Sequence, residues 1–157
     1  MDVKFIENNY QFLLRTSALI FNKDKDKVLL FKVKDRDFYL LPGGKVERFD
    51  SSLNSLKREM KEELGEDYSK INFVFLGISE EFVYDKGLNN HQINIMYKGV
   101  YESEISDLVF NGLEGDWVSF EWVDIKDFDD VIIYPSKLKE IVKNPSDIYH
   151  VVESLED

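Results

Sequence analysis

The chain has 157 residues, no cysteine and a formal net charge of −11 from 20 basic and 31 acidic residues. This length suits one domain with its own core, so we expect a single domain over residues 1–157. The lack of cysteine excludes disulfides, thiolate metal sites and thiol catalysis. The acidic charge disfavours long nucleic acids and anionic membranes, which bind basic surfaces.

The first residues carry no pattern typical of an export signal. Asp2, Lys4 and Glu7 interrupt the segment that would need to be an apolar core. No uncharged apolar run approaches the ~18 residues that a membrane helix requires. We therefore expect a cytoplasmic protein.

Hydrophobic periodicity predicts strands interleaved with two helices. The predicted elements, in chain order, are strands at 11–21, 28–33 and 38–41, a helix at 51–64, strands at 71–78, 92–101 and 117–123, and a helix from Pro135 to about Lys143. The charged turn at 22–27 joins the first two strands as a hairpin. Such interleaving favours an α/β or α+β sandwich.

The helix predicted at 51–64 carries two stripes of side chains, with Asp50 or Ser51 as its N-cap. At ~100° per residue, an apolar stripe forms that consists of Leu53, Leu56, Met60 and Leu64. Beside it lie three carboxylates whose i, i+3 and i+4 spacing makes them neighbours: Glu59, Glu62 and Glu63. They form either a solvated acidic face or a site for a hard cation such as Mg²⁺ or Mn²⁺. The helix alone leaves both interpretations open.

A glycine turn precedes this helix. Leu41-Pro42-Gly43-Gly44 ends a predicted strand, and paired glycines allow the backbone to approach a ligand closely or to adopt positive φ. A strand, a glycine turn, a loop and a carboxylate helix together have the layout of a phosphate and metal site.

These segments resemble the signature of the Nudix hydrolase family, which is Gly, five residues, Glu, seven residues, then Arg-Glu-apolar-any-Glu-Glu-any-Gly-apolar. The matching positions in the box at 44–66 are Gly44, Asp50, Arg58, Glu59, Glu62, Glu63 and Gly65. The resemblance implies an α/β fold, a Nudix-type α/β/α sandwich with a mixed β-sheet. Three positions depart from the pattern. Asp50 replaces Glu, Glu66 replaces an apolar residue, and Phe49 stands where close relatives commonly have Gly.

The resemblance also implies roles for single residues. The implied metal ligands, for Mg²⁺ or Mn²⁺, are the Gly44 carbonyl, Asp50, Glu59, Glu62 and Glu63. The implied catalytic residues are Glu62, Glu59, Arg58, which holds the box carboxylates in place, and Glu121, at a late acidic position. The general base stays open among Glu62, Glu121, Glu81 and His91, and Gln92 occupies a position where some relatives have a carboxylate.

Substrate contacts are harder to predict. Arg15 and Lys32 lie on the first predicted hairpin and offer cations to phosphates, although ordinary surface charge is the alternative. Gly43 and Gly44 are the other predicted substrate-binding residues.

The resemblance implies a divalent-metal-dependent pyrophosphohydrolase that cleaves a nucleoside diphosphate linked to another moiety. The alternative is a Nudix-like nucleotide-binding or regulatory domain with weakened catalysis. We expect a small nucleotide-type substrate, no long nucleic acid, no membrane partner, and a monomer or homodimer.

Overall fold

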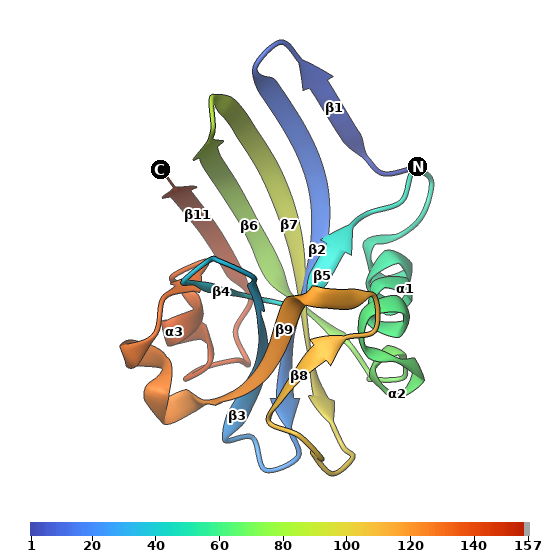
Figure 1. The fold of residues 1–157 in the computed structure, drawn as a ribbon, viewed down its shortest axis with the longest axis vertical. Helices are drawn as coiled ribbons and strands as arrows, with labels where there is room; N and C mark the ends of the chain where they lie inside the picture. Colours follow the sequence, from blue (N-terminus) through green and yellow to red (C-terminus); the bar gives the residue numbers. More distant parts are fainter. Residues whose placement is uncertain (156–157) are drawn as a thin grey trace.

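The computed structural model describes residues 1–155, which form a mixed β-sheet with helices on both sides (Figure 1). The strands are β1 (Lys4–Glu7), β2 (Tyr10–Asn22), β3 (Lys27–Val33), β4 (Tyr39–Leu40), β5 (Gly43–Lys45), β6 (Val74–Asp85), β7 (Leu88–Tyr101), β8 (Val109–Gly112), β9 (Gly115–Asp124), β10 (Ile133–Tyr134) and β11 (Tyr149–Leu155). The helices are α1 (Ser52–Leu64), α2 (Glu66–Ser69), α3 (Leu138–Ile141) and the 3₁₀ helix η1 (Ile125–Asp130). The predicted α/β class is confirmed.

The long strand β2 is the centre of the sheet. It pairs in parallel with β7 along its whole length. β6 then runs antiparallel to β7, and β11 runs parallel to β6. β2 meets β3 only at Phe21 opposite Val28, while β3 pairs with β9. The strands predicted at 11–21 and 28–33 are therefore confirmed, but their hairpin splits into two halves of an opened sheet (Figure 1).

Alternation along β2 sends its side chains into two separate cores, as expected from the two-residue period of a strand. Leu19 lies in the core that includes Leu138 of α3. Ile20 points the other way, into the core that includes Leu56 and Met60 of α1. The same strand therefore contributes to both cores, and its next residues toward the N-terminus reach the site described below.

The helix predicted at 51–64 is confirmed as α1. The Ser51 side chain accepts a hydrogen bond from the backbone N–H of Asn54, so Ser51 is the N-cap. The helix ends at Gly65, whose φ of 107° suits glycine. The buried residues of the apolar stripe, Leu56 and Met60, hold the helix against the sheet.

Other boundaries differ from the prediction. The C-terminal helix is shorter, because the chain beyond α3 forms i to i+3 turn bonds such as Lys143 N–H to the Glu140 carbonyl. β6 begins three residues late, because Ile71 and Phe73 pack into the core as loop residues. The short strands β1, β5, β8 and β10 and the edge strand β11 were not predicted. In the described part of the chain, no helix is long and apolar enough to cross a membrane.

Candidate active site

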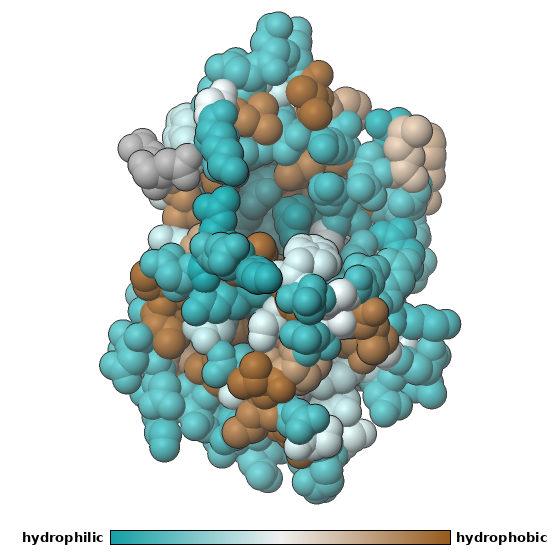
Figure 2. Space-filling model, in the orientation of Figure 1, coloured by the Kyte–Doolittle hydropathy of each residue, from teal (hydrophilic) through white to brown (hydrophobic). Residues whose placement is uncertain are grey.

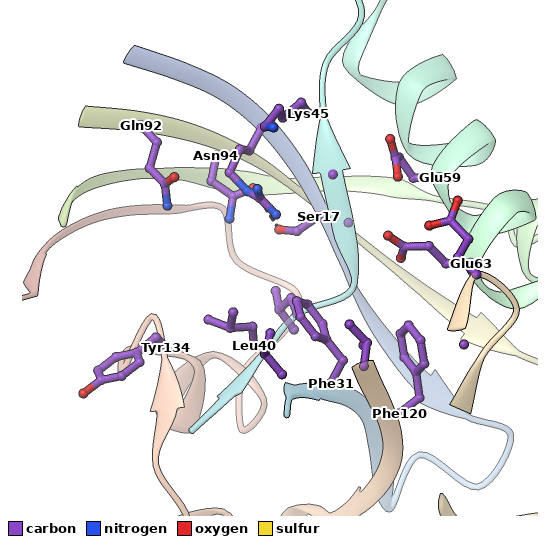
Figure 3. Close-up of a pocket in the computed structure, with 18 of the residues that line it drawn as sticks. Ser17, Phe31, Leu40, Lys45, Glu59, Glu63, Gln92, Asn94, Phe120 and Tyr134 are labelled. Carbon is purple, nitrogen blue, oxygen red and sulfur yellow. Dashed lines mark hydrogen bonds between the residues drawn. The ribbon is translucent and has the colours of Figure 1, made fainter. Parts of the chain in front are cut away.

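The opening between the two halves of the sheet forms a cleft of about 500 Å³. Figure 2 shows this hollow near the middle of one face of the molecule. The cleft has an apolar wall that includes Phe31, Leu40, Phe120 and Tyr134 and a polar wall that includes Ser17, Gln92 and Asn94 (Figure 3). Glu59 and Glu63 of α1 lie at one end of it (Figure 3).

Three carboxylates gather at this end of the cleft. Glu59 and Glu63 are joined there by Glu114, from the turn between β8 and β9. A 2.9 Å hydrogen bond from the Leu113 N–H to the Glu63 carbonyl oxygen holds that turn against the end of α1. Burial raises the pKa of Glu59. Burial, with the charges of Glu59 and Glu114, raises the pKa of Glu63 to about 8. A cation placed among these groups would offset their repulsion.

The paired glycines, predicted as a turn, instead lie in the strand β5, where they allow it to pass between β2 and α1. A Cβ atom on Gly43 would overlap the Thr16 carbonyl oxygen, and a Cβ on Gly44 would overlap the Glu59 carboxylate. The paired glycines are therefore required for close approach of the backbone to its neighbours. Both glycines line the cleft.

Arg58 connects the loop before α1 to the carboxylates of the helix. Its guanidinium nitrogens lie 3.2 Å from Glu47 Oε2, 3.1 Å from Glu59 Oε1 and 3.8 Å from Glu62 Oε1. It also donates to the Lys45 carbonyl oxygen at 3.5 Å. Glu47 was assigned no role from the sequence, although it lies inside the box. This arrangement suits a positioning residue that orients Glu59.

Two cations lie between the ends of the cleft. Arg15 of β2 is opposite Lys45 of β5 in the sheet register, and both line the cleft. Burial raises the pKa of Glu81, as it raises that of Glu63, and the positive charge of Arg15 opposes both shifts, so Arg15 lies near both carboxyl groups. Within residues 1–155 the Arg15 side chain makes no hydrogen bond or ion pair. Its donors are available to an anionic ligand.

The structure does not bring Glu121 or Lys32 to the cleft. Phe120 faces the cleft, so strand alternation turns Glu121 to the opposite face of β9. There the Tyr39 hydroxyl donates a hydrogen bond to Glu121. Lys32 lies on the same side of the sheet, with its ammonium 5.2 Å from the centre of the Tyr39 ring.

Asp50 and Glu62 also lie outside the lining of the cleft. The Asp50 carboxylate accepts hydrogen bonds from the Ser51 N–H and the Asn54 side-chain amide at the start of α1. The Glu62 side chain is 48% exposed, against 18% for Glu59. Of the predicted ligands, Gly44, Glu59 and Glu63 are therefore brought together, and the sequence analysis missed Glu114.

The donors at the acidic end suit a hard divalent cation. They are carboxylates, which Mg²⁺ and Mn²⁺ prefer. The raised pKa values of Glu59 and Glu63 also show that burial disfavours further negative charge at this end unless a cation offsets it. Within the described chain, no three acidic or histidine side chains are already placed to hold a metal. A cation held at this end would therefore require the carboxylates of Glu59 and Glu63 to move closer together.

The titration of Glu63 predicts how the metal-free protein responds to pH. Its folded-state pKa of about 8 lies above the ordinary value of 4.5, so the folded state keeps a proton that the unfolded chain has lost. Stability should therefore fall as the pH rises from about 5 to 8.5. Thermal melting in EDTA should show a fall of about 10 °C over this pH range, and a smaller fall in Glu63→Gln. The exposed Glu140→Gln should behave as wild type. An equal fall in Glu63→Gln would contradict this assignment.

Phe49 provides a second prediction, on stability. This fully exposed residue has a φ of 61°, in the left-handed region that disfavours side chains. Phe49→Gly should raise the free energy of unfolding in urea by about 1 kcal/mol, because glycine relieves that strain. Phe49→Ala keeps the Cβ atom and is the control that should show no such gain. Equal stability of the two variants would contradict a strained backbone at this position.

Comparisons with known proteins agree on one family. The family model of the NUDIX domain matches residues 12–145. MutT of Bacillus halodurans has a similar structure, with a TM-score of 0.61 and 20% identity over 92% of this chain and 89% of its own. The dihydroneopterin triphosphate pyrophosphohydrolase of E. coli has a TM-score of 0.63 and 16% identity, and the match covers 83% of this chain and 92% of its own. MutT of Methanosarcina mazei Go1 has a TM-score of 0.56 and 22% identity, and the match covers 90% of this chain and 96% of its own. These structures share the fold at low identity. No curated protein sequence matches the chain.

Proposed function

The chain belongs to the Nudix family of hydrolases, and on that premise we propose that it is a divalent-metal-dependent pyrophosphohydrolase of small nucleotide-type substrates. The observation that carries this proposal is the order of groups in one cleft. The carboxylates of Glu59, Glu63 and Glu114 lie at one end, and Arg15, without a hydrogen-bonding partner in residues 1–155, lies next to them.

Each group has a distinct role in this proposal. Glu59, Glu63 and the Gly44 carbonyl would hold Mg²⁺ or Mn²⁺, which polarises a phosphoryl oxygen and lowers the pKa of a bound water. Arg15 and Lys45 bind and orient the anionic phosphates. Glu114 is not on the helix, and its carboxylate accepts the proton of the attacking water.

Three residues outside the cleft would help to position the groups inside it. Arg58 keeps Glu59 in place through its contact at 3.1 Å. Asp50 stabilises the start of α1 through its hydrogen bond to the Ser51 N–H. Glu62, exposed beside Arg58, can turn toward a bound metal only by leaving its ion pair at 3.8 Å.

We further propose that the chain acts as a single domain, in the cytoplasm, as a monomer or homodimer. Its net charge of −11 supports a small metal-bound substrate over a long nucleic acid.

The test is phosphate or pyrophosphate release from a panel of nucleotides and nucleoside diphosphate derivatives. Turnover of at least one compound should depend on Mg²⁺ or Mn²⁺ and disappear in EDTA. Nucleotide binding without turnover under any metal condition would favour a binding or regulatory domain instead. Neither binding nor turnover would overturn the proposal.

A further inference from the structure

A buried polar cluster lies on the wall of the cleft away from the helix. Glu81 of β6 is only 8% exposed and faces the cleft. Gln92 Nε2 donates to its Oε2 at 2.7 Å, and Ser79 Oγ donates to its Oε1 at 3.3 Å. Close to this carboxylate, Asn94 Oδ1 accepts a hydrogen bond from Ser17 Oγ at 2.9 Å. The cluster is therefore rigidly held by three neighbouring strands.

The sheet register explains why these groups share one surface. Glu81 lies opposite Gln92, and Ser79 lies opposite Asn94, in the pairing of β6 with β7. Asn94 in turn lies opposite Arg15 of β2. Directly opposed residues point to the same face of a sheet, so the cluster continues into the cationic part of the cleft.

Counting hydrogen bonds shows what the cluster can still accept. A carboxylate has about four acceptor positions, and the hydrogen bonds from Gln92 and Ser79 occupy two of them at Glu81. Because Gln92 Nε2 faces this carboxylate, the Gln92 Oε1 atom is a second acceptor, and within residues 1–155 it has no donor. Figure 3 shows the Gln92 side chain extending from its strand into the cleft. Two adjacent acceptors are thus offered to a ligand.

A ring that fits this wall must be flat and must present two adjacent N–H donors. The apolar wall opposite, with Phe31 and Leu40 (Figure 3), suits the face of an aromatic ring. Guanine has a ring N–H beside an exocyclic amino group. Adenine, uracil and unprotonated cytosine each place an acceptor next to their donor.

We infer that Glu81 and Gln92 read the donor edge of a guanine base, which makes guanine nucleotides the preferred substrates. This inference rests on the proposed function, because it places the base in the same cleft as the hydrolysed phosphates. Arg15 acts electrostatically on both Glu81 and Glu63, so a nucleotide with its base at Glu81 directs its phosphates past Arg15 to the acidic end.

The experiment measures kcat/KM for GTP, ITP and ATP with Mg²⁺. ITP lacks only the amino group of guanine and so isolates its contribution. Wild type should prefer GTP over ITP and over ATP by about 10- to 100-fold, as expected when buried polar groups lose their partner. Glu81→Gln should reduce kcat/KM for GTP by a similar factor, because the NH₂ group of the new amide would face an N–H donor of guanine. The same variant should change kcat/KM for ATP by less than about 2-fold.

The control is Glu80→Gln on the same strand. Glu80 points to the opposite face, where it contacts His150 Nε2 at 2.6 Å, so the preference of this variant for GTP should equal that of wild type. If Glu81→Gln does not fold, Gln92→Met removes the second acceptor and should also reduce the preference. Equal wild-type rates on all three nucleotides, or equal losses on all three in Glu81→Gln, would overturn the inference and leave the hydrolase intact.

Failure of the hydrolase itself is distinguished by binding. If no nucleotide is hydrolysed, calorimetric titration of wild type with GMP and AMP tests the base site alone. Tighter binding of GMP that is lost in Glu81→Gln supports the inference, and equal affinities overturn it.

Discussion

Glu63→Gln is expected to lower kcat/KM of the best nucleotide substrate by about 100- to 1,000-fold, the range for removal of one group that stabilises transition-state charge. Glu63 lies in the acidic end of the cleft with Glu59 and Glu114. Its neutral replacement keeps the size of the side chain but lacks the negative charge that a divalent metal requires. The change should also weaken the stabilisation of the folded protein by Mg²⁺ in thermal melting.

The matched control is Glu66→Gln. Glu66 lies just after the same helix and pairs with Lys61 at 3.3 Å on the surface, so hydrolysis and the Mg²⁺ effect should be unchanged. Because Glu63→Gln removes a charge that repels Glu59, this variant without metal should melt no lower than wild type at pH 8. Wild-type activity in Glu63→Gln would place the metal elsewhere.

Arg15→Ala should lower kcat/KM by about 10- to 100-fold, because a charge-assisted contact to phosphate contributes about 1.5–3 kcal/mol. Arg15→Lys should recover part of the loss, since it keeps the charge without the planar fork. Arg15 also lowers the pKa of Glu63. Its removal should therefore shift the pH dependence of metal binding and activity to higher pH.

Lys23→Ala, in the charged turn between β2 and β3, changes the net charge equally and is the control for non-specific electrostatics. A loss in Lys23→Ala as large as that in Arg15→Ala would mean that overall charge, not a phosphate contact, explains the effect. An unchanged pH profile in Arg15→Ala would mean that the charge of Arg15 does not act on the carboxylates at the acidic end of the cleft.

Local sequence signals were sufficient for α1 and its contribution to the site. The stripes of the helix depend only on its period, so the neighbours Glu59 and Met60 could be assigned to their faces before the fold was known. Residue types alone also predicted the end of the helix at Gly65 and limited the N-cap to Asp50 or Ser51, of which the structure shows Ser51.

Contacts between distant segments could not be predicted in this way. Glu114 reaches the helix because the β8–β9 turn binds the end of α1 through Leu113, and no local pattern reports that approach. The direction of the Glu121 side chain, in contrast, could have been predicted from the alternation of residues along its strand. Val118, Phe120 and Trp122 alternate with it, so a strand that buries these residues turns Glu121 away.

The pairing of β2 with β7 has a consequence for how the protein reaches its native state. The side chains of Gln11 and Asn90, which join these strands, are 79 residues apart. Closing so long a loop costs entropy before any contact repays it, and parallel pairings between remote segments slow folding. The polar wall and the cationic part of the cleft depend on this pairing. Fragments that end before Leu88 would therefore contain the Nudix box and its helix without the polar wall of the cleft.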